Sequence, residues 1–200
     1  GFSAGSGQEQ IGYDGANLAR DHGVVVVSLN HRLNVLGFLD LSGFGARYAA
    51  SGNLGMTDIV KALEWVRDNI SVFGGDPANV TVFGQSGGGG KVCTLLAMPS
   101  AKGLFSKAVV ESGSILEAQT QKWSRRIGAA TVRRLGISPA RIADIESVPY
   151  ATLLEAYDAA VAEVRTEAEH EGGLPENLLD QLLFGTRPVV DSEVLPHQPG

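Results

Sequence analysis

The most informative stretch of this chain is Val80-Thr81-Val82-Phe83-Gly84-Gln85-Ser86-Gly87-Gly88-Gly89-Gly90. Its first four residues are apolar or β-branched and predict a short buried strand. The glycines predict a sharp turn, and residues 91–98 then predict a helix. A strand, a tight turn with a serine at its apex and a following helix form the setting of a nucleophile elbow. We therefore interpret Ser86 as a catalytic nucleophile.

The residues around the serine support this interpretation. Gly84 and Gly88 lie two positions before and after Ser86, where a tight backbone leaves little room for a Cβ atom. A serine at the start of a helix also lies beside free backbone N–H groups, which stabilise an anion. The alternative is a purely structural glycine-rich turn. The same short pattern recurs at residues 1–5 around Ser3, but no strand precedes it, so we expect no elbow there.

Length and composition favour a globular domain and argue against a nucleic-acid-binding or membrane-spanning protein. Two hundred residues, 44% of them hydrophobic and 19% charged, suit one globular domain with a sizeable core. The net charge of −6, without a basic run, argues against nucleic acid and anionic membranes as partners. The apolar run at residues 24–27 is far too short to span a bilayer. Cys93 is the single cysteine, which excludes an internal disulfide.

The first half of the chain alternates predicted helices and strands. We expect a short helix near residues 13–20 that ends at Gly23, and a strand over the apolar residues 24–29. A long loop follows, and Thr57 is a suitable N-cap for a helix that reaches Ile70. Residues 107–112 predict a third strand after the elbow helix. This alternation predicts an α/β fold with a mostly parallel sheet and helices on both of its faces.

The pattern changes from residue 119 onward. Three amphipathic segments near residues 120–135, 138–145 and 150–170 predict a helical insertion over the sheet, with no strand between them. Residues 188–196 then predict extended or turn structure.

Several motifs along the chain occur in a recognisable order. They are Gly1-Phe2 with Gly5-Ser6, Tyr13-Asp14-Gly15, Asn30-His31-Arg32-Leu33, Gly52-Asn53-Leu54-Gly55 with Asp58, Asn69-Ile70 with residues 73–77, the elbow, and Pro188-Val189-Val190-Asp191 with Leu195-Pro196. Their order and spacing resemble the type-B carboxylesterase family, the cholinesterase-like branch of the α/β-hydrolases. The resemblance covers nearly the whole chain and is least specific over residues 120–185.

The resemblance implies that residues 1–200 are part of one α/β-hydrolase catalytic domain. Residues 1–118 would form the sheet core with the oxyanion loop and the elbow, residues 119–185 a helical layer, and residues 186–200 the start of the next core segment. It implies a small-molecule ester as substrate, cleaved through a serine. We expect no cofactor and no metal ion, and the oligomeric state stays open.

The resemblance also assigns site residues. Ser86 corresponds to the nucleophile, Gly87 to one oxyanion N–H donor, and Gly1 to the last glycine of the oxyanion loop. The position of Gly87 is commonly alanine in the family. Gln85 stands where the family often has glutamate, which argues against a preference for cationic substrates. Ser112 is a candidate hydrogen-bond partner of the triad acid or, equally, a plain serine at the end of a strand.

A complete triad is not evident. His22 and His31 precede the serine, against the order of this fold, and His170 ends a polar helix. The group of Asp191, Glu193 and His197 is too closely spaced to come from two separate loops, and we interpret it as surface loop. By resemblance, the acid and the histidine lie beyond Gly200.

The resemblance also implies an inner strand of the sheet that residues 1–200 do not contain. This strand should lie in the sheet between the strands predicted at residues 24–29 and 80–84. The chain begins at Gly1 inside a glycine-rich loop. We therefore expect a piece of a longer protein, cytoplasmic or secreted, and inactive by itself.

Two other functions remain open at this point. A non-catalytic, cholinesterase-like adhesion or binding protein would usually lack the nucleophile, which is present here. An α/β-hydrolase that cleaves thioesters or amides fits residues 1–200 as well as an esterase does.

Overall fold

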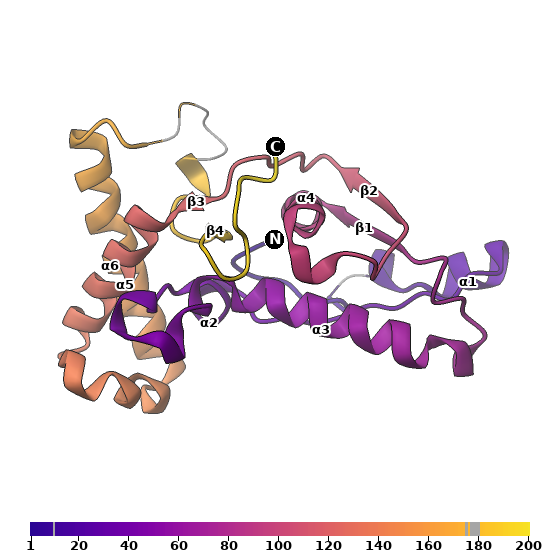
Figure 1. The fold of residues 1–200 in the computed structure, drawn as a ribbon, viewed down its shortest axis with the longest axis horizontal. Coiled ribbons are helices and arrows are strands. Elements are labelled where there is room, and N and C mark those ends of the chain that lie inside the picture. Colours follow the sequence, from indigo (N-terminus) through magenta and orange to yellow (C-terminus); the bar gives the residue numbers. More distant parts are fainter. Residues whose placement is uncertain (10, 175, 177–180) are drawn as a thin grey trace.

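The computed structural model describes residues 1–9, 11–174, 176 and 181–200. Its helix α1 lies at one end of an elongated molecule, the pair α5 and α6 at the other, and α3 runs along the length between them (Figure 1). The α-helices are α1 (Ala16–His22), α2 (Asn34–Phe38), α3 (Leu54–Asn69), α4 (Gly87–Ala97), α5 (Gln121–Arg134) and α6 (Tyr150–His170). The strands are β1 (Thr81–Gln85), β2 (Lys107–Glu111), β3 (Gln119–Thr120) and β4 (Val189–Val190).

Strands β1 and β2 pair in parallel, as the alternation of elements predicts. Val110 on β2 faces α4, because its side chain lies beside Gly89 of that helix. Phe83 and Val109 are register partners on the opposite face, and they are 55% and 44% exposed. In the described part of this sheet, helix α4 covers one face, and the predicted helices on the other face stay a prediction.

The strand predicted over residues 24–29 does not form. These residues have no ladder partner in the described structure, and Val24, Val25 and Val27 are all more than 40% exposed. A strand requires a neighbouring strand to satisfy its backbone N–H and C=O groups. Here a groove of about 790 Å³, lined by residues 24–27 and also by Val80 and Val82, takes the place of that neighbour.

Helix α3 begins earlier than its sequence predicts. Its first residue is Leu54 and its N-cap residue is Asn53, whereas Thr57 lies one turn inside and donates its hydroxyl to the carbonyl of Leu54. The apolar face is as expected, since Ile59, Leu63 and Val66 are buried. This face packs with the inner side of α4 into the main core.

Helices α5 and α6 agree with the predicted segments, and a 3₁₀ helix, Pro139–Ser147, connects them. They pack on each other around a separate apolar core that includes Trp123, Ile127 and Tyr157. Figure 1 places this pair at the end of the molecule away from β1 and β2, rather than over that sheet.

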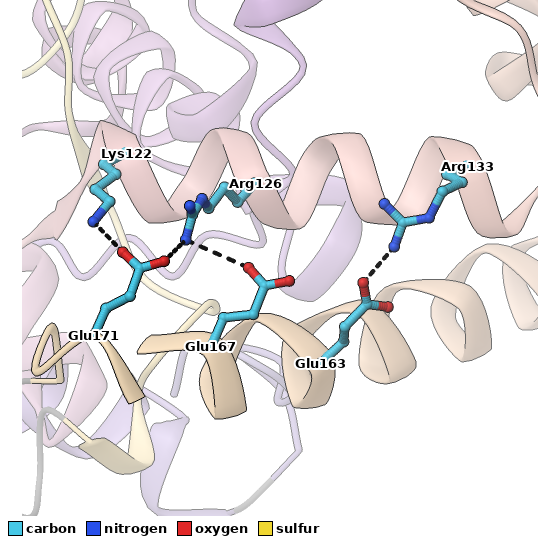
Figure 2. A network of polar contacts seen from close by, with 6 residues as sticks. All are labelled: Lys122, Arg126, Arg133, Glu163, Glu167 and Glu171. Atoms are coloured by element: carbon cyan, nitrogen blue, oxygen red, sulfur yellow. Dashed lines mark hydrogen bonds and ion pairs between the residues drawn. The ribbon is translucent and has the colours of Figure 1, made fainter. Parts of the chain in front are cut away.

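A row of ion pairs joins the exposed edges of α5 and α6 (Figure 2). Arg126 contacts both Glu171 (2.6 Å) and Glu167 (3.4 Å), and Lys122 shares Glu171 (2.7 Å). These side chains are 41–55% exposed, so solvent screens the ion pairs and they contribute little to stability. The buried apolar contacts are therefore the main interaction between the two helices.

The C-terminal segment returns to the main core. Strand β4 pairs in parallel with β3, and Val194 and Leu195 are buried in the main core beyond it. In the described ranges, none of the helices is long and apolar enough to cross a lipid bilayer.

Candidate active site

The predicted strand, turn and helix are present around Ser86, but the strand is not buried as predicted, since its residues are exposed or partly exposed. Strand β1 ends at Gln85, and α4 begins at Gly87, earlier than the sequence predicts. Ser86 between them has φ 55° and ψ −120°, a conformation that L-residues rarely adopt. Its N–H donates to the carbonyl of Glu111 (2.8 Å), and its own carbonyl accepts from the N–H of Gly90 (3.0 Å). The surrounding backbone thus holds a strained, exposed serine at the tip of the sheet.

The glycines at this turn have different roles. A Cβ atom on Gly84 would lie 2.5 Å from the carbonyl of Gly88, so this position requires glycine. A Cβ atom on Gly88 would meet nothing within 4 Å, and the expected clash at this position is wrong. Of the glycines that pack against Ser86, the one with the least room lies outside the motif. A Cβ atom on Gly113 would lie 1.9 Å from the carbonyl oxygen of Ser86.

The two glycines assigned to the oxyanion hole lie against each other. A Cβ atom on Gly87 would lie 2.8 Å from Cα of Gly1 and 3.3 Å from the nitrogen of Phe2. Because Gly87 has no side chain, the N-terminal loop approaches the start of α4 more closely than alanine would allow. The first N–H groups of a helix have no partner within it, and Gly87 places them beside Gly1.

Two further residues hold this loop, and sequence reasoning missed both. The N–H of Asn34 donates to the carbonyl of Phe2 (2.9 Å), and Nζ of Lys91 donates to the carbonyl of Gly1 (2.5 Å). Asn34 has φ 51°, which asparagine tolerates better than most residues. A lysine within an otherwise apolar helix was the signal for Lys91. Phe2 itself is buried and packs edge-on against Phe38, with ring centroids 5.7 Å apart.

The residues flanking the elbow are open to solvent. Gln85 is exposed and lies opposite Glu111 in the register of β1 and β2. Ser112 follows β2, is exposed and has φ 50°, so the loop turns sharply there to bring Gly113 beneath Ser86. Neither side chain has a contact that assigns it a role. Ser3 lies in a loop without a strand before it, as expected.

None of the four histidines forms a hydrogen bond to Ser86 in the described structure. His22 and His170 are exposed residues at the ends of α1 and α6, and His197 is exposed with Nδ1 2.8 Å from the carbonyl oxygen of Gln198. His31 is half-buried, with Nδ1 2.9 Å from the carbonyl oxygen of Arg32. Burial lowers the pKa of His31, and the positive charge of Lys91 lowers it further.

The side chains of Asp191 and His197 have backbone and amide partners instead of each other, so the group of Asp191, Glu193 and His197 does not form an acid–histidine pair. Oδ1 of Asp191 accepts from the N–H groups of Glu193, Val194 and Leu195, at 2.6–3.0 Å. Its Oδ2 accepts from the side-chain amide of Asn53 (2.8 Å). Both carboxylate oxygens therefore hold the C-terminal loop. In the part of the chain that the structure describes, no cluster of His, Cys, Asp and Glu side chains could hold a metal ion.

Comparison with known proteins connects this geometry to a family. The model of the carboxylesterase family matches residues 1–200. The chain is 44% identical to the para-nitrobenzyl esterase of Bacillus subtilis (strain 168) over 199 residues, which are 99% of this chain and 37% of that protein. It is also 46% identical to the acetylcholinesterase of Gallus gallus over 134 residues, 67% of this chain and 16% of that enzyme.

A solved structure supports the same relationship. The structure of a PNB esterase superposes with a TM-score of 0.85 at 41% identity, covering 99% of this chain and 39% of the other. The chain thus spans well under half the length of these relatives. The fold of the solved relatives, the family match over all 200 residues and the two named homologues agree, and the chain belongs to the type-B carboxylesterase, cholinesterase-like family.

Proposed function

We propose that this chain carries the nucleophile and part of the oxyanion hole of a serine carboxylesterase. The observation that carries the proposal is the conformation of Ser86, at φ 55° and ψ −120° between β1 and α4, with the loop at Gly1 packed against Gly87. Such strain persists where surrounding structure enforces it, and it is typical of functional sites. The family match and the esterase relatives support the same reaction.

The proposed reaction proceeds in two steps through an acyl-enzyme. Oγ of Ser86 attacks the carbonyl carbon of the ester, its proton passes to a base, and the alcohol leaves with a proton. Water then cleaves the acyl-serine and regenerates the hydroxyl. In both steps the N–H groups of Gly87 and Gly1 donate to the developing oxyanion, and loss of one such donor commonly costs about 10²–10³ in rate.

The base and its acid partner belong, in this proposal, to chain outside these 200 residues. His31 and His197 make contacts with backbone carbonyls, and Asp191 has both oxygens occupied. The groove beside residues 24–27 supports the same proposal, because it lies where the family resemblance places an inner strand. We propose that this strand leads into the oxyanion loop at Gly1 and fills the groove.

The substrate is proposed to be a small or medium, largely uncharged carboxylic ester. Gln85 places a neutral side chain beside the nucleophile, so the elbow supplies no carboxylate for a cationic group. Thioesters and amides react through the same acyl-enzyme, and only their relative rates distinguish these activities.

The test is covalent labelling of the full-length protein with a fluorophosphonate probe. We expect the adduct on Ser86 by mass spectrometry, and complete loss of labelling in Ser86→Ala. Ser3→Ala is the matched control, because Ser3 shares the short sequence pattern, and it should label like the wild type.

The outcomes separate the alternatives. An adduct on Ser3 or Ser112 would contradict the elbow assignment, and no adduct at all would favour a binding or adhesion protein. If the protein is labelled but cleaves thioesters or amides in preference to p-nitrophenyl esters, the assignment of Ser86 as nucleophile stands and the proposed ester substrate is wrong. Residual ester cleavage by Ser86→Ala, about 10³–10⁴ over water, would be compatible with the proposal.

A further inference from the structure

Lys91 is buried in a way that calls for an explanation. It lies in the second turn of α4 and is only 7% exposed. Lysine is rarely buried to this extent unless it is paired with an acid. Among the residues that the structure describes, no carboxylate forms an ion pair with Lys91, and burial lowers its pKa to about 8. The fold therefore retains a costly ammonium group directly behind the elbow.

The hydrogen bond and the ring contact of the Lys91 ammonium both involve the oxyanion loop. Nζ donates to the carbonyl of Gly1 and lies 4.9 Å from the centroid of the Phe2 ring. We propose that Lys91 is a positioning residue of the oxyanion hole, which anchors the Gly1 carbonyl and thereby restricts the backbone rotation of Gly1, the residue whose N–H is a proposed oxyanion donor. This inference rests on the function proposed above and adds a residue to its machinery.

The loop needs such an anchor because Gly1 is a glycine. A glycine has wide freedom in φ and ψ, so its N–H is poorly aimed unless the neighbouring groups hold it. The buried Phe2 ring and the Asn34 N–H fix the residue that follows Gly1. The bond from Lys91 fixes the carbonyl of Gly1 itself, on the loop that packs against Gly87. Oxyanion donors act through such fixed geometry.

The titratable groups around Lys91 come from three sides. His31 faces it from the loop before α2, with Asp58 of α3 and its partner Arg32 behind that ring. The amino group of Gly1 faces it from the oxyanion loop, and its pKa is lowered by burial and by Lys91. The pKa of His31 is lowered, so any effect of His31 on the reaction belongs to the acidic part of the pH profile and not to the alkaline part. When residues precede Gly1, its nitrogen is an amide and does not titrate.

The charge of Lys91 should therefore appear in the alkaline pH dependence of the reaction. Below a pH of about 8 the ammonium makes a charge-assisted hydrogen bond to Gly1, and above it a neutral amine makes a weaker one. We expect kcat of the full-length protein for a p-nitrophenyl ester to fall as the pH rises through about 8.

Three variants test this role. Lys91→Met removes the charge and the donor, and we expect kcat to fall about tenfold or more with KM nearly unchanged, because misplacement of a catalytic donor costs on this order. Lys91→Gln retains a donor without a charge, so its kcat should be intermediate and lack the decline near pH 8. Lys102→Met, on an exposed lysine, should retain the wild-type kcat and pH profile.

The proposal is overturned if Lys91→Met retains wild-type kcat, or if Lys91→Gln keeps the alkaline decline. Should the Met variant fail to fold by circular dichroism, the Gln variant decides alone. An unchanged esterase rate in Ser86→Ala would instead contradict the proposed function, whatever Lys91 does. The two failures are thus distinguishable in one set of measurements.

Discussion

The side-chain amide of Asn53 donates a hydrogen bond to Oδ2 of Asp191, across 138 residues of sequence and with 2.8 Å between the two atoms. The same amide donates to the carbonyl of Val189 (2.7 Å), and its oxygen accepts from the N–H of Val189 (2.9 Å). Asn53 is completely buried. One side chain at the start of α3 thereby fastens the C-terminal segment to the main core.

Asn53→Ala should destabilise the fold strongly. The substitution leaves three buried polar groups without this partner, and each such group costs about 1–3 kcal/mol. We expect the free energy of unfolding to fall by at least about 3 kcal/mol in urea titrations. Asn17→Ala, at an exposed position of α1, is the control and should change it little. A small effect of Asn53→Ala would show that the C-terminal segment is held by its apolar contacts.

The two glycines of the elbow should respond differently to alanine. Gly84→Ala places a methyl group 2.5 Å from the backbone of Gly88, which must then move and shift Ser86. We expect fluorophosphonate labelling of the full-length protein to slow about 10²-fold, as for a misplacement of about 1 Å. Gly88→Ala meets open space and favours the helix, so its labelling rate should stay near that of the wild type. Equal losses in both variants would contradict this account.

The buried charge of Lys91 should make stability depend on pH. The pKa of Lys91 is about 8 in the folded chain and 10.5 ordinarily, so between these values the unfolded chain binds more protons. Stability therefore rises as the pH is raised from about 8 to about 10.5, and is reduced below that window. At pH 7 we expect Lys91→Met to be more stable by about 2–3 kcal/mol.

Urea unfolding at pH 7 and at pH 10.5 measures this effect, with Lys102→Met as the control. The gain of Lys91→Met should shrink at the higher pH. A gain that is the same at both values would mean that packing, and not the charge, is responsible.

The pair of Arg32 and Asp58 connects the loop before α2 to α3. Nε and Nη2 of Arg32 contact the two oxygens of Asp58 at 2.9 and 2.6 Å, and the N–H of Arg32 adds a third bond. Hydrogen bonding from Arg32 lowers the pKa of Asp58. This contribution is therefore present above the ordinary pKa of 3.8 and is lost as the pH falls through the lowered value.

We expect Asp58→Asn to reduce stability at pH 7 by about 1–2 kcal/mol, since the pair is partly exposed. The difference from the wild type should disappear in strong acid. Asp68→Asn is the matched control, because Asp68 pairs with its exposed sequence neighbour Arg67. A loss that persists at low pH would point to helix packing in place of the ion pair.

Gln85 should limit any preference for cationic substrates. For the full-length protein we expect kcat/KM for a choline ester to exceed that for its neutral isostere by less than tenfold, about 1.4 kcal/mol. Gln85→Glu introduces a carboxylate beside Ser86 and should raise this ratio. A strong choline preference in the wild type would mean that another residue supplies the negative charge.

Where the decisive information is local, the sequence predicted the structure well. Strand β2, helices α5 and α6, the end of α1 at Gly23 and the elbow at Ser86 follow their residue patterns closely. In each case the period of apolar residues or the position of a glycine determines backbone conformation over a few residues.

Other features depended on partners far along the chain. Residues 24–29 have the composition of a buried strand, yet a strand forms only beside another strand, and a groove lies there instead. The need for glycine at position 113 arises because its loop passes beneath Ser86, and no local pattern encodes that approach. The strand, turn and helix around Ser86 were thus predictable from the residues alone, because turn geometry is local. The bond from Lys91 to the carbonyl of Gly1 was not, because it joins segments 90 residues apart that meet only when the chain packs.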